Sequence, residues 1–400
     1  MLRQFGAFEP VGKEELLRRI AGLKAMMAER GIDFAVIMEN VNRFYFTGTI
    51  QRGMLVIALN CEPLLFIERS VERARLDTPL EVIPIRSDRE VRKTLEEKNI
   101  LQGKGGLELD VLPVAVFERF KNIIGFSDFT DLSVLIKELR IIKSPYELEQ
   151  IRKSGAIFSH VFTRAQEVIR EGVSEVEIET HLAAAARMQG HQGLSRIRGF
   201  NMAALPMCVF TGYTTGLASY WDGPISGVGV NPSVPQGSSF NKVRRGIPVL
   251  VDCGISYNGY VTDETRAFTV GEMESLFRKP YEVAREIIED AEHFGKEGVN
   301  ATELFQRAIQ MVQQAGLEEH FMGHGEGRVS FIGHGLGLEI NELPVITARH
   351  SRLLEEGMVF AYEPKFVFPG SGAIGIEVSF IVRKDRLERV SDVPIDIAYV

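Results

Sequence analysis

The sequence has little of what disulfide frameworks, membrane anchors and nucleic-acid surfaces need. Its three cysteines are odd in number and far apart, so we expect no disulfide framework and a reducing, cytoplasmic location. No apolar run approaches the roughly 20 residues of a membrane span. Basic tracts are lacking and the net charge is -8, which makes nucleic acid and anionic membranes poor partners. The first 17 residues have no apolar core, and so we expect no signal peptide.

Histidine is missing from the first part of the chain. All eight histidines lie at or after His160, which places any imidazole chemistry in the second part. A chain of 400 residues is too long for one ordinary core, and we expect two domains, 1–138 and 139–400. Helical and strand patterns alternate up to about residue 135, beginning with a helix over 13–31, and this alternation is typical of α/β domains.

The second part opens with a helix start signal and contains an internal repeat. Ser144, Pro145 and Glu147 have the spacing of an N-cap, a first helical residue and a capping-box carboxylate. Residues 171–190 and 297–316 both begin Glu-Gly-Val, place a cap residue three before a glutamate, and end in glycine. A long helical pattern precedes each copy. The repeat indicates a duplicated helix–helix–sheet unit, although two similar helices could also arise by chance.

The stretch PVLVDCGISYNGYVTDETRAFTV predicts an acidic β-hairpin. Asn258-Gly259 is a strong two-residue turn signal between two strand patterns. With that turn, residue 252 pairs with Thr265, and Asp263 becomes a diagonal neighbour of Asp252 on one face. Two adjacent carboxylates near a sheet core are costly unless a cation is shared between them. The alternative is a pair of solvated acids on an exposed hairpin.

Three further polar residues lie in apolar strand patterns. His334 stands among the glycines of FIGHGLGLEINELP, Glu363 ends the apolar run of MVFAYEPKF, and Glu377 lies mid-strand in AIGIEVSFIV. A mid-strand glutamate in apolar surroundings is unusual unless it is paired. The connection PGSGA predicts a hairpin that brings Glu363 and Glu377 roughly opposite each other. Together with the acidic hairpin, these residues predict a metal site.

Charge indicates how many ions such a site would hold. Four carboxylates and one imidazole suit two divalent cations about 3.5–4 Å apart, with some carboxylates bridging, and a water between them would lose a proton and become the nucleophile. This oxygen-rich donor set suits Mn, Fe or Co as well as Zn. We therefore expect two divalent ions per chain.

The order Asp, Asp, His, Glu, Glu, in the contexts VDCG, TDETR, GHGLGLE, EP and GIEV, resembles the pita-bread metallohydrolases, which include aminopeptidase P, prolidase, methionine aminopeptidase and creatinase. NRFYFTG at 42–48 resembles their creatinase-type N-terminal domain. The resemblance implies an α/β N-terminal domain, an α+β pita-bread catalytic domain and a homodimer.

The resemblance also implies a role for each ligand. Asp252 would chelate one metal ion, and Asp263 and Glu377 would bridge the two ions. His334 and Glu363 would hold the second ion, and Glu363 would be the catalytic residue that accepts a proton from the attacking water.

The chain departs from this family at three substrate-side positions. Gln236 and Asn341 stand where the peptidases carry histidines, and Gly375 stands where an arginine often precedes the last ligand. An amide can orient a substrate carbonyl through a hydrogen bond, but it cannot carry a proton. We therefore expect Gln236 and Asn341 to bind substrate, and proline-peptidase activity to be weak.

The segment 193–223 is longer than the short strand and turn that we expect there. Arg196 and Arg198 alternate along it and would face one side, where they could bind a substrate carboxylate, while Tyr220 and Trp221 could form an aromatic wall. The alternative is a surface salt-bridge pair and a packing aromatic.

The sequence therefore predicts a binuclear metal-dependent hydrolase that resembles Xaa-Pro aminopeptidases and Xaa-Pro dipeptidases and acts on a small peptide. The alternative is a creatinase-like hydrolase or lyase that acts on a small amide, amidino or sulfonium compound. A binding protein that has lost turnover is a third hypothesis, but such a protein has no need of five buried ligands.

Overall fold

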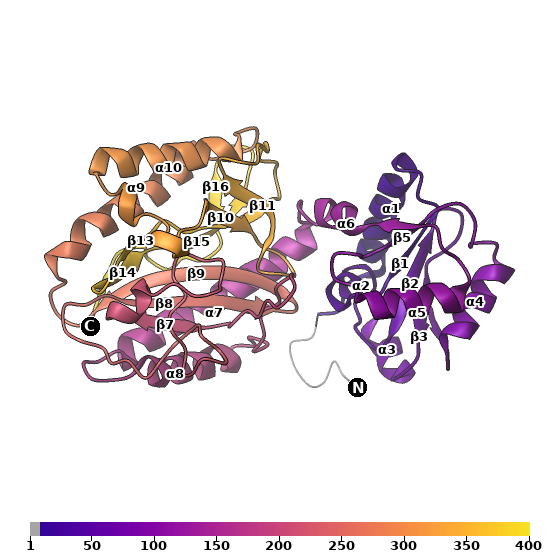
Figure 1. Ribbon diagram of the computed structural model, residues 1–400, viewed down its shortest axis with the longest axis horizontal. Helices are drawn as coiled ribbons and strands as arrows, with labels where there is room; N and C mark the ends of the chain where they lie inside the picture. The colour runs from indigo at the N-terminus through magenta and orange to yellow at the C-terminus, as the bar shows by residue number, and fades with distance from the viewer. Residues whose placement is uncertain (1–8) are drawn as a thin grey trace. The chain divides into compact units, whose positions relative to one another are not determined.

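The computed structural model describes residues 9–400, which divide into two compact units (Figure 1). One unit runs to Arg140 and includes Gly199–Asn201, and the other comprises Ile141–Arg198 and Met202–Val400. The boundary predicted from the sequence falls two residues earlier. Part of the N-terminal segment that we used to argue against a signal peptide lies outside the described residues. Within the described part of the chain, no helix has the length and apolar character needed to cross a membrane.

The first unit is built on a mixed six-stranded sheet in the order β4-β3-β2-β1-β5-β6. Strands β1 to β3 pair antiparallel, and the outer pairs β3-β4, β1-β5 and β5-β6 are parallel. This confirms the predicted α/β class. The strands are β1 (Phe34–Ile37), β2 (Gly53–Ala58), β3 (Leu64–Ile67), β4 (Val82–Pro84), β5 (Gly105–Leu107) and β6 (Phe129–Asp131).

The helices of the first unit are α1 (Lys13–Glu29), α2 (Asn40–Thr47), α3 (Val71–Asp77), α4 (Asp88–Glu97), α5 (Val114–Ile124) and α6 (Ser133–Leu139). Helix α1 ends two residues before the predicted Gly31. Gly31 has a φ of 63°, and its N–H and that of Ile32 bond back to the last turn at 3.2 and 2.9 Å. Gly31 is thus the left-handed residue that terminates the helix.

The second unit repeats one arrangement twice, which confirms the predicted duplication and the pita-bread fold. Helices α7 (Pro145–Val168) and α8 (Glu175–Met188) pack on a sheet of order β17-β9-β8-β7, and α9 (Ser275–Phe294) and α10 (Ala301–Ala315) pack on the later strands (Figure 1). Each half has its own apolar core between helices and sheet. The later strands form the sheet β11-β10-β12-β15-β16 and the hairpin β13-β14.

The strands of this unit are β7 (Cys208–Thr211), β8 (Val249–Tyr257), β9 (Tyr260–Thr269), β10 (Phe331–Gly335), β11 (Glu342–Thr347), β12 (Val359–Tyr362), β13 (Lys365–Phe368), β14 (Gly372–Gly375), β15 (Val378–Val382), β16 (Leu387–Arg389) and β17 (Ala398–Tyr399), with short 3-10 turns at Gly212–Gly216, Glu318–His320 and Gly325–Gly327.

The helix starts agree with the sequence signals. The Ser144 side chain accepts from the Glu147 N–H at 3.3 Å, and the Glu147 carboxylate accepts from the Ser144 N–H at 3.0 Å, which completes the predicted capping box. Asn300 caps α10 in a second box, and Ser174 caps α8. These caps satisfy backbone N–H groups that the first helical turn leaves without partners.

Candidate metal centre and substrate pocket

The acidic hairpin has the predicted register. Asp252 pairs with Thr265, and Gly254 pairs with Asp263 across β8 and β9. The turn residues Asn258 and Gly259 have φ values of 47° and 91°, as a two-residue turn of this type requires. Every residue of β9 is buried, and the Asp263 side chain is 9% exposed. The alternative of two solvated acids is therefore wrong.

The remaining predicted ligands, which come from the later strands, lie near the two aspartates of the hairpin. His334 belongs to β10, and Glu363 directly follows β12. Lys365 pairs with Gly375 in one hairpin and Tyr362 pairs with Val378 in the next, so Glu363 and Glu377 lie near each other, as predicted. Glu377 is not mid-strand, however. It occupies a break between β14 and β15 and forms a backbone bridge to Thr265, because the chain changes pairing partner there.

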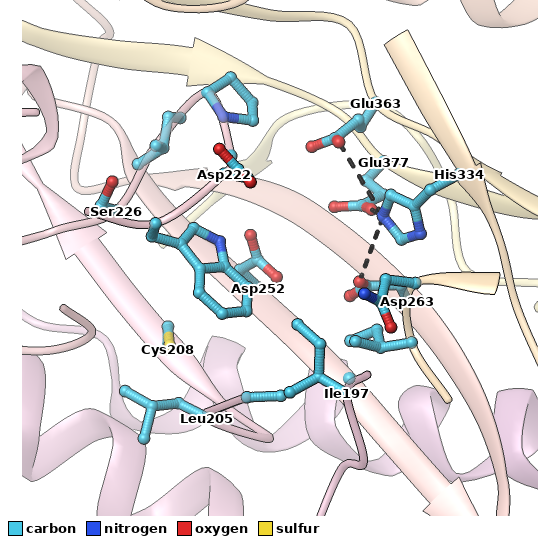
Figure 2. A pocket seen from close by; sticks show the side chains of 18 of the residues that line it. Ile197, Leu205, Cys208, Asp222, Ser226, Asp252, Asp263, His334, Glu363 and Glu377 are labelled. Carbon is cyan, nitrogen blue, oxygen red and sulfur yellow. Dashed lines mark ion pairs between the residues drawn. The ribbon is translucent and has the colours of Figure 1, made fainter. Parts of the chain in front are cut away.

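His334 shares a small space with three carboxylates (Figure 2). Its Nε2 atom lies 3.8 Å from Asp263 Oδ2, 3.9 Å from Glu363 Oε1 and 3.7 Å from Glu377 Oε1. These separations exceed hydrogen-bonding distance. They are compatible with ligands of one ion, because two atoms that are each about 2.1 Å from a cation can be at most about 4.2 Å apart.

The surroundings of this space also fit a cation. Ligand atoms of Asp263, His334 and Glu377 all lie within 4.8 Å of one another. Asp263 Oδ1 is buried and has no hydrogen-bond partner among the residues that the structure describes. Burial, followed by the charges of Glu377 and Asp252, raises the pKa of Asp263 well above its ordinary value. A divalent ion would remove the cost of keeping that carboxylate ionised.

Lys365, which is not among the residues predicted from the sequence, lies inside the cluster. Its Nζ atom donates hydrogen bonds to Glu377 Oε2 at 2.8 Å, Glu363 Oε2 at 2.9 Å and Asp252 Oδ2 at 3.2 Å. The side chain is 4% exposed. Burial lowers the pKa of Lys365, but the three carboxylates outweigh it and hold that pKa well above the ordinary value. A lysine in the apolar strand KFVF was the available signal, since buried lysines are nearly always paired.

The five predicted ligands form part of the wall of a cavity of about 350 Å³. The other walls are largely apolar and include Trp221 and Phe331, together with Ile197 and Leu205 (Figure 2). Tyr220, predicted beside Trp221 as part of an aromatic wall, is 52% exposed and is not among the lining residues. The structure therefore places one of the two aromatic residues at the cavity.

The two amides at histidine positions both line the cavity, but they differ in what they can offer a substrate. Gln236 Nε2 donates to the Ala203 carbonyl at 2.8 Å, and its Oε1 atom is buried without a hydrogen-bond partner in the described part of the chain. Asn341 donates to the Arg198 carbonyl at 2.8 Å and accepts from the Arg198 N–H at 2.9 Å. The Asn341 amide is thus occupied by main chain, which argues against its predicted substrate role.

The two arginines predicted to bind a carboxylate are not among the residues that line the cavity in the described chain. Arg198 forms an ion pair with Glu339 at 3.6 Å, and the Arg196 carbonyl accepts from the Ile340 N–H at 2.8 Å. Ile197, between them, lines the cavity instead. Alternation along the segment cannot tell which side chains face the cavity.

Comparison with known proteins identifies the family. Residues 149–384 match the family model of metallopeptidase family M24, and residues 19–142 match that of the creatinase/prolidase N-terminal domain. The chain belongs to metallopeptidase family M24. It is 29% identical to an Xaa-Pro dipeptidase of Pyrococcus furiosus over 376 residues, which is 93% of this chain and 97% of that protein.

Solved structures of similar proteins have the same fold. An Xaa-Pro dipeptidase from Bacillus anthracis aligns with a TM-score of 0.82 at 26% identity, covering 96% of this chain and 100% of the other. An X-Pro aminopeptidase from Thermotoga maritima aligns with a TM-score of 0.78 at 26% identity, covering 95% and 99%. These comparisons confirm the predicted fold and metallohydrolase class, and they favour a dipeptidase-like enzyme over the creatinase-like alternative. Family membership implies a divalent metal cofactor.

Proposed function

We propose that this family M24 chain is a metal-dependent peptidase that cleaves short peptides at Xaa-Pro bonds. The observation that carries the proposal is the meeting of Asp263, His334, Glu363 and Glu377 in the wall of an apolar cavity. The dipeptidase and aminopeptidase relatives support the substrate class. Carboxylates with a single imidazole suit Mn, Fe, Co or Zn.

Different residues of the chain bind the metal ion, accept the proton and orient the substrate. A divalent ion held by these four residues supplies Lewis-acid chemistry that activates water and polarises a carbonyl at neutral pH. Glu363 accepts the proton of the attacking water, as the family resemblance implies. Its Oε2 atom is hydrogen-bonded to Lys365, and its Oε1 atom lies 3.9 Å from His334 Nε2. Gln236 is the amide best placed to orient the substrate, because its Oε1 atom has no hydrogen-bond partner among residues 9–400.

The cavity wall supports an apolar substrate. Trp221, Phe331 and Ile340 also line the cavity, and a prolyl ring buries its methylene groups well against such apolar side chains. Lys365 is the only lysine or arginine among the cavity-lining residues of the described chain, and its donors are already engaged. Binding therefore relies on apolar contact more than on a cation for the peptide's C-terminal carboxylate.

The proposal is tested on the full chain, stripped of metal with a chelator and reloaded with Mn or Co. Hydrolysis of alanyl-proline and alanyl-prolyl-alanine is compared with hydrolysis of alanyl-alanine and alanyl-alanyl-alanine. We expect selective cleavage at proline that needs the metal, with a kcat/KM below about 10⁴ M⁻¹s⁻¹, because neither Gln236 nor Asn341 can carry a proton. Asp263→Asn serves as the control for contaminating peptidases. Equal rates for wild type and this variant on every peptide would refute the proposed activity.

We also propose that the chain is a cytoplasmic homodimer. The family resemblance supports the dimer, and the three free cysteines support a reducing compartment. Light scattering at micromolar concentration should give twice the chain mass of 44.7 kDa, and a mass of one chain would refute the dimer. Fractionation of the source cells should place the chain with cytoplasmic marker proteins, and recovery with an extracytoplasmic fraction would refute the location.

A further inference from the structure

Lys365 occupies a cation position within the acidic cluster. An ammonium group has three N–H donors, and all three of its nearby acceptors are predicted metal ligands: Asp252, Glu363 and Glu377. The lysine is therefore bound as a metal ion would be, through several carboxylates at once. A surface lysine that merely leaned over the site would keep its Nζ atom in solvent, whereas this side chain is 4% exposed.

The strands around Lys365 provide room for its side chain. Lys365 pairs with Gly375 across the β13–β14 hairpin. A Cβ atom at Gly375 would lie 2.6 Å from Lys365 Cγ and 2.7 Å from its Cα, which is closer than real contacts permit. Gly375 is the position where the peptidases that the sequence resembles often carry an arginine. The loss of a side chain at residue 375 and the presence of the buried lysine are thus parts of one local arrangement.

The two glutamates bridge between Lys365 and the position beside His334. Glu363 turns Oε2 to Lys365 and Oε1 to His334, and Glu377 does the same. Thr265 Oγ1 also donates to Glu377 Oε2 at 2.9 Å, which fixes the orientation of that carboxylate. Bridging carboxylates of this kind join two cations in two-metal sites. Here one of the two cations is the lysine.

Space and charge both disfavour a second ion beside Asp252. An ion about 2.1 Å from Asp252 Oδ2 and Glu377 Oε2 would fall in the volume of the Nζ atom, which lies 3.2 and 2.8 Å from those oxygens. Four carboxylates carry a charge of -4. One divalent ion together with the lysine leaves -1, whereas two ions together with the lysine would leave +1 in a buried site, where excess charge is costly.

We propose that the Lys365 ammonium takes the place of one of the two metal ions, so that the chain binds a single divalent ion through Asp263, His334, Glu363 and Glu377. Asp252 then serves as a partner of Lys365 and not as a metal ligand. The inference rests on the proposed function only in that a divalent ion binds. It changes the expected metal content from two divalent ions per chain, the number expected from the count of carboxylates, to one.

The test counts metal ions independently of turnover. The full chain is stripped of metal, equilibrated with excess Co, passed through a desalting column and analysed for Co per chain. We expect one Co per chain for wild type and for Lys365→Arg, which keeps the charge, and two for Lys365→Ala, which removes the charge and opens the space. Two Co in wild type, or one in a folded Lys365→Ala variant, would overturn the proposal.

A matched pair of variants on one hairpin keeps the inference testable if Lys365→Ala does not fold. Asp252→Asn should retain one Co and the visible absorption spectrum of the wild-type Co protein, because Asp252 binds the lysine and not the ion. Asp263→Asn should lose the ion and the spectrum. Loss of Co in Asp252→Asn to the same extent as in Asp263→Asn would show that Asp252 binds metal. One Co without proline-peptide cleavage would refute the proposed function alone, and two Co with cleavage would refute this inference alone.

Discussion

Asn341 holds the main chain of Arg198 through a pair of hydrogen bonds, one in each direction, at 2.8 and 2.9 Å. Ile197, which lines the cavity, belongs to the segment that contains Arg198. The contact therefore joins this segment to the loop before β11. A histidine at 341 could not make both bonds with one ring edge, because its donor and acceptor nitrogens lie on different sides of the ring. The amide here therefore has a structural role in addition to being a departure from the peptidase pattern.

We predict that Asn341→Ala loosens this segment. Removing two partly exposed hydrogen bonds should cost about 1 kcal/mol of local stability, and amide hydrogen exchange at Arg198 should speed up by roughly 5- to 10-fold. Native-state hydrogen exchange with peptide-level mass spectrometry measures this change. Asn300→Ala, which alters a distant helix cap, is the control. Unchanged exchange across residues 195–198 would show that the pair does not restrain the segment.

Glu363→Gln should reduce turnover far more than substrate binding. Loss of the proton acceptor should lower kcat on a proline dipeptide by about 10²- to 10⁴-fold, with a smaller change in KM. Glu342→Gln is the matched control, because Glu342 also lines the cavity but accepts from the Leu338 N–H at 2.7 Å and pairs with Lys143 at 3.3 Å. A similar fall in kcat for both variants would contradict a distinct role for Glu363. Metal content is measured alongside, because Glu363 is also a proposed ligand.

The buried ion pair of Arg266 and Glu264 should contribute to the free energy of unfolding. Both side chains are 0% exposed and 3.0 Å apart, and Arg266 also donates to the Glu377 carbonyl at 2.6 Å. Arg266→Met leaves a buried carboxylate without its cation, so the free energy of unfolding should fall by about 3–5 kcal/mol.

The double variant Arg266→Met with Glu264→Gln should recover part of this loss, because the uncompensated charge is gone. Urea unfolding followed through Trp221, the only tryptophan, measures the transition of this unit. If the double variant were no more stable than Arg266→Met, an unbalanced charge would not be the cause.

Glu108 in the first unit should make stability depend on pH. Its carboxylate is 1% exposed and accepts from the N–H groups of Met38 and Glu39 at 2.7 and 2.9 Å. Burial, opposed by these hydrogen bonds, raises the pKa of Glu108 from 4.5 to about 7. Between these values the folded chain keeps the proton and the unfolded chain releases it, so the contribution is fully present below pH 4.5 and is lost as the pH rises through 7.

Glu108→Gln should remove this pH dependence. Between pH 4.5 and 7, wild type should lose roughly 2–3 kcal/mol relative to the variant. Denaturant unfolding followed by circular dichroism across this range gives the comparison, and the other titrating groups cancel because both chains carry them. Parallel stability curves for the two chains would mean that Glu108 ionises normally in the folded state.

Much of the candidate site could be predicted from local sequence patterns. The turn Asn258-Gly259 sets the register of the β8–β9 hairpin, and a period of two in the strands then decides that Asp252 and Asp263 share a face. The capping boxes at Ser144 and Asn300 are equally local, because their partners are three residues apart. These contacts join residues that are close in the sequence, and backbone geometry fixes how such residues meet. The sequence alone therefore determined the hairpin register and the helix caps.

What only the tertiary structure decided depends on partners from distant strands. Lys365 follows Glu363 by two residues, yet its position depends on the room left by Gly375 and on Asp252, which is more than 100 residues away. Asn341 binds Arg198 across 143 residues. Alternation along a segment predicts that Arg196 and Arg198 share a side, but packing decides that Ile197 lines the cavity. A long flexible side chain pairs with whichever charged groups lie near it in the folded chain, and only the tertiary structure determines which groups those are.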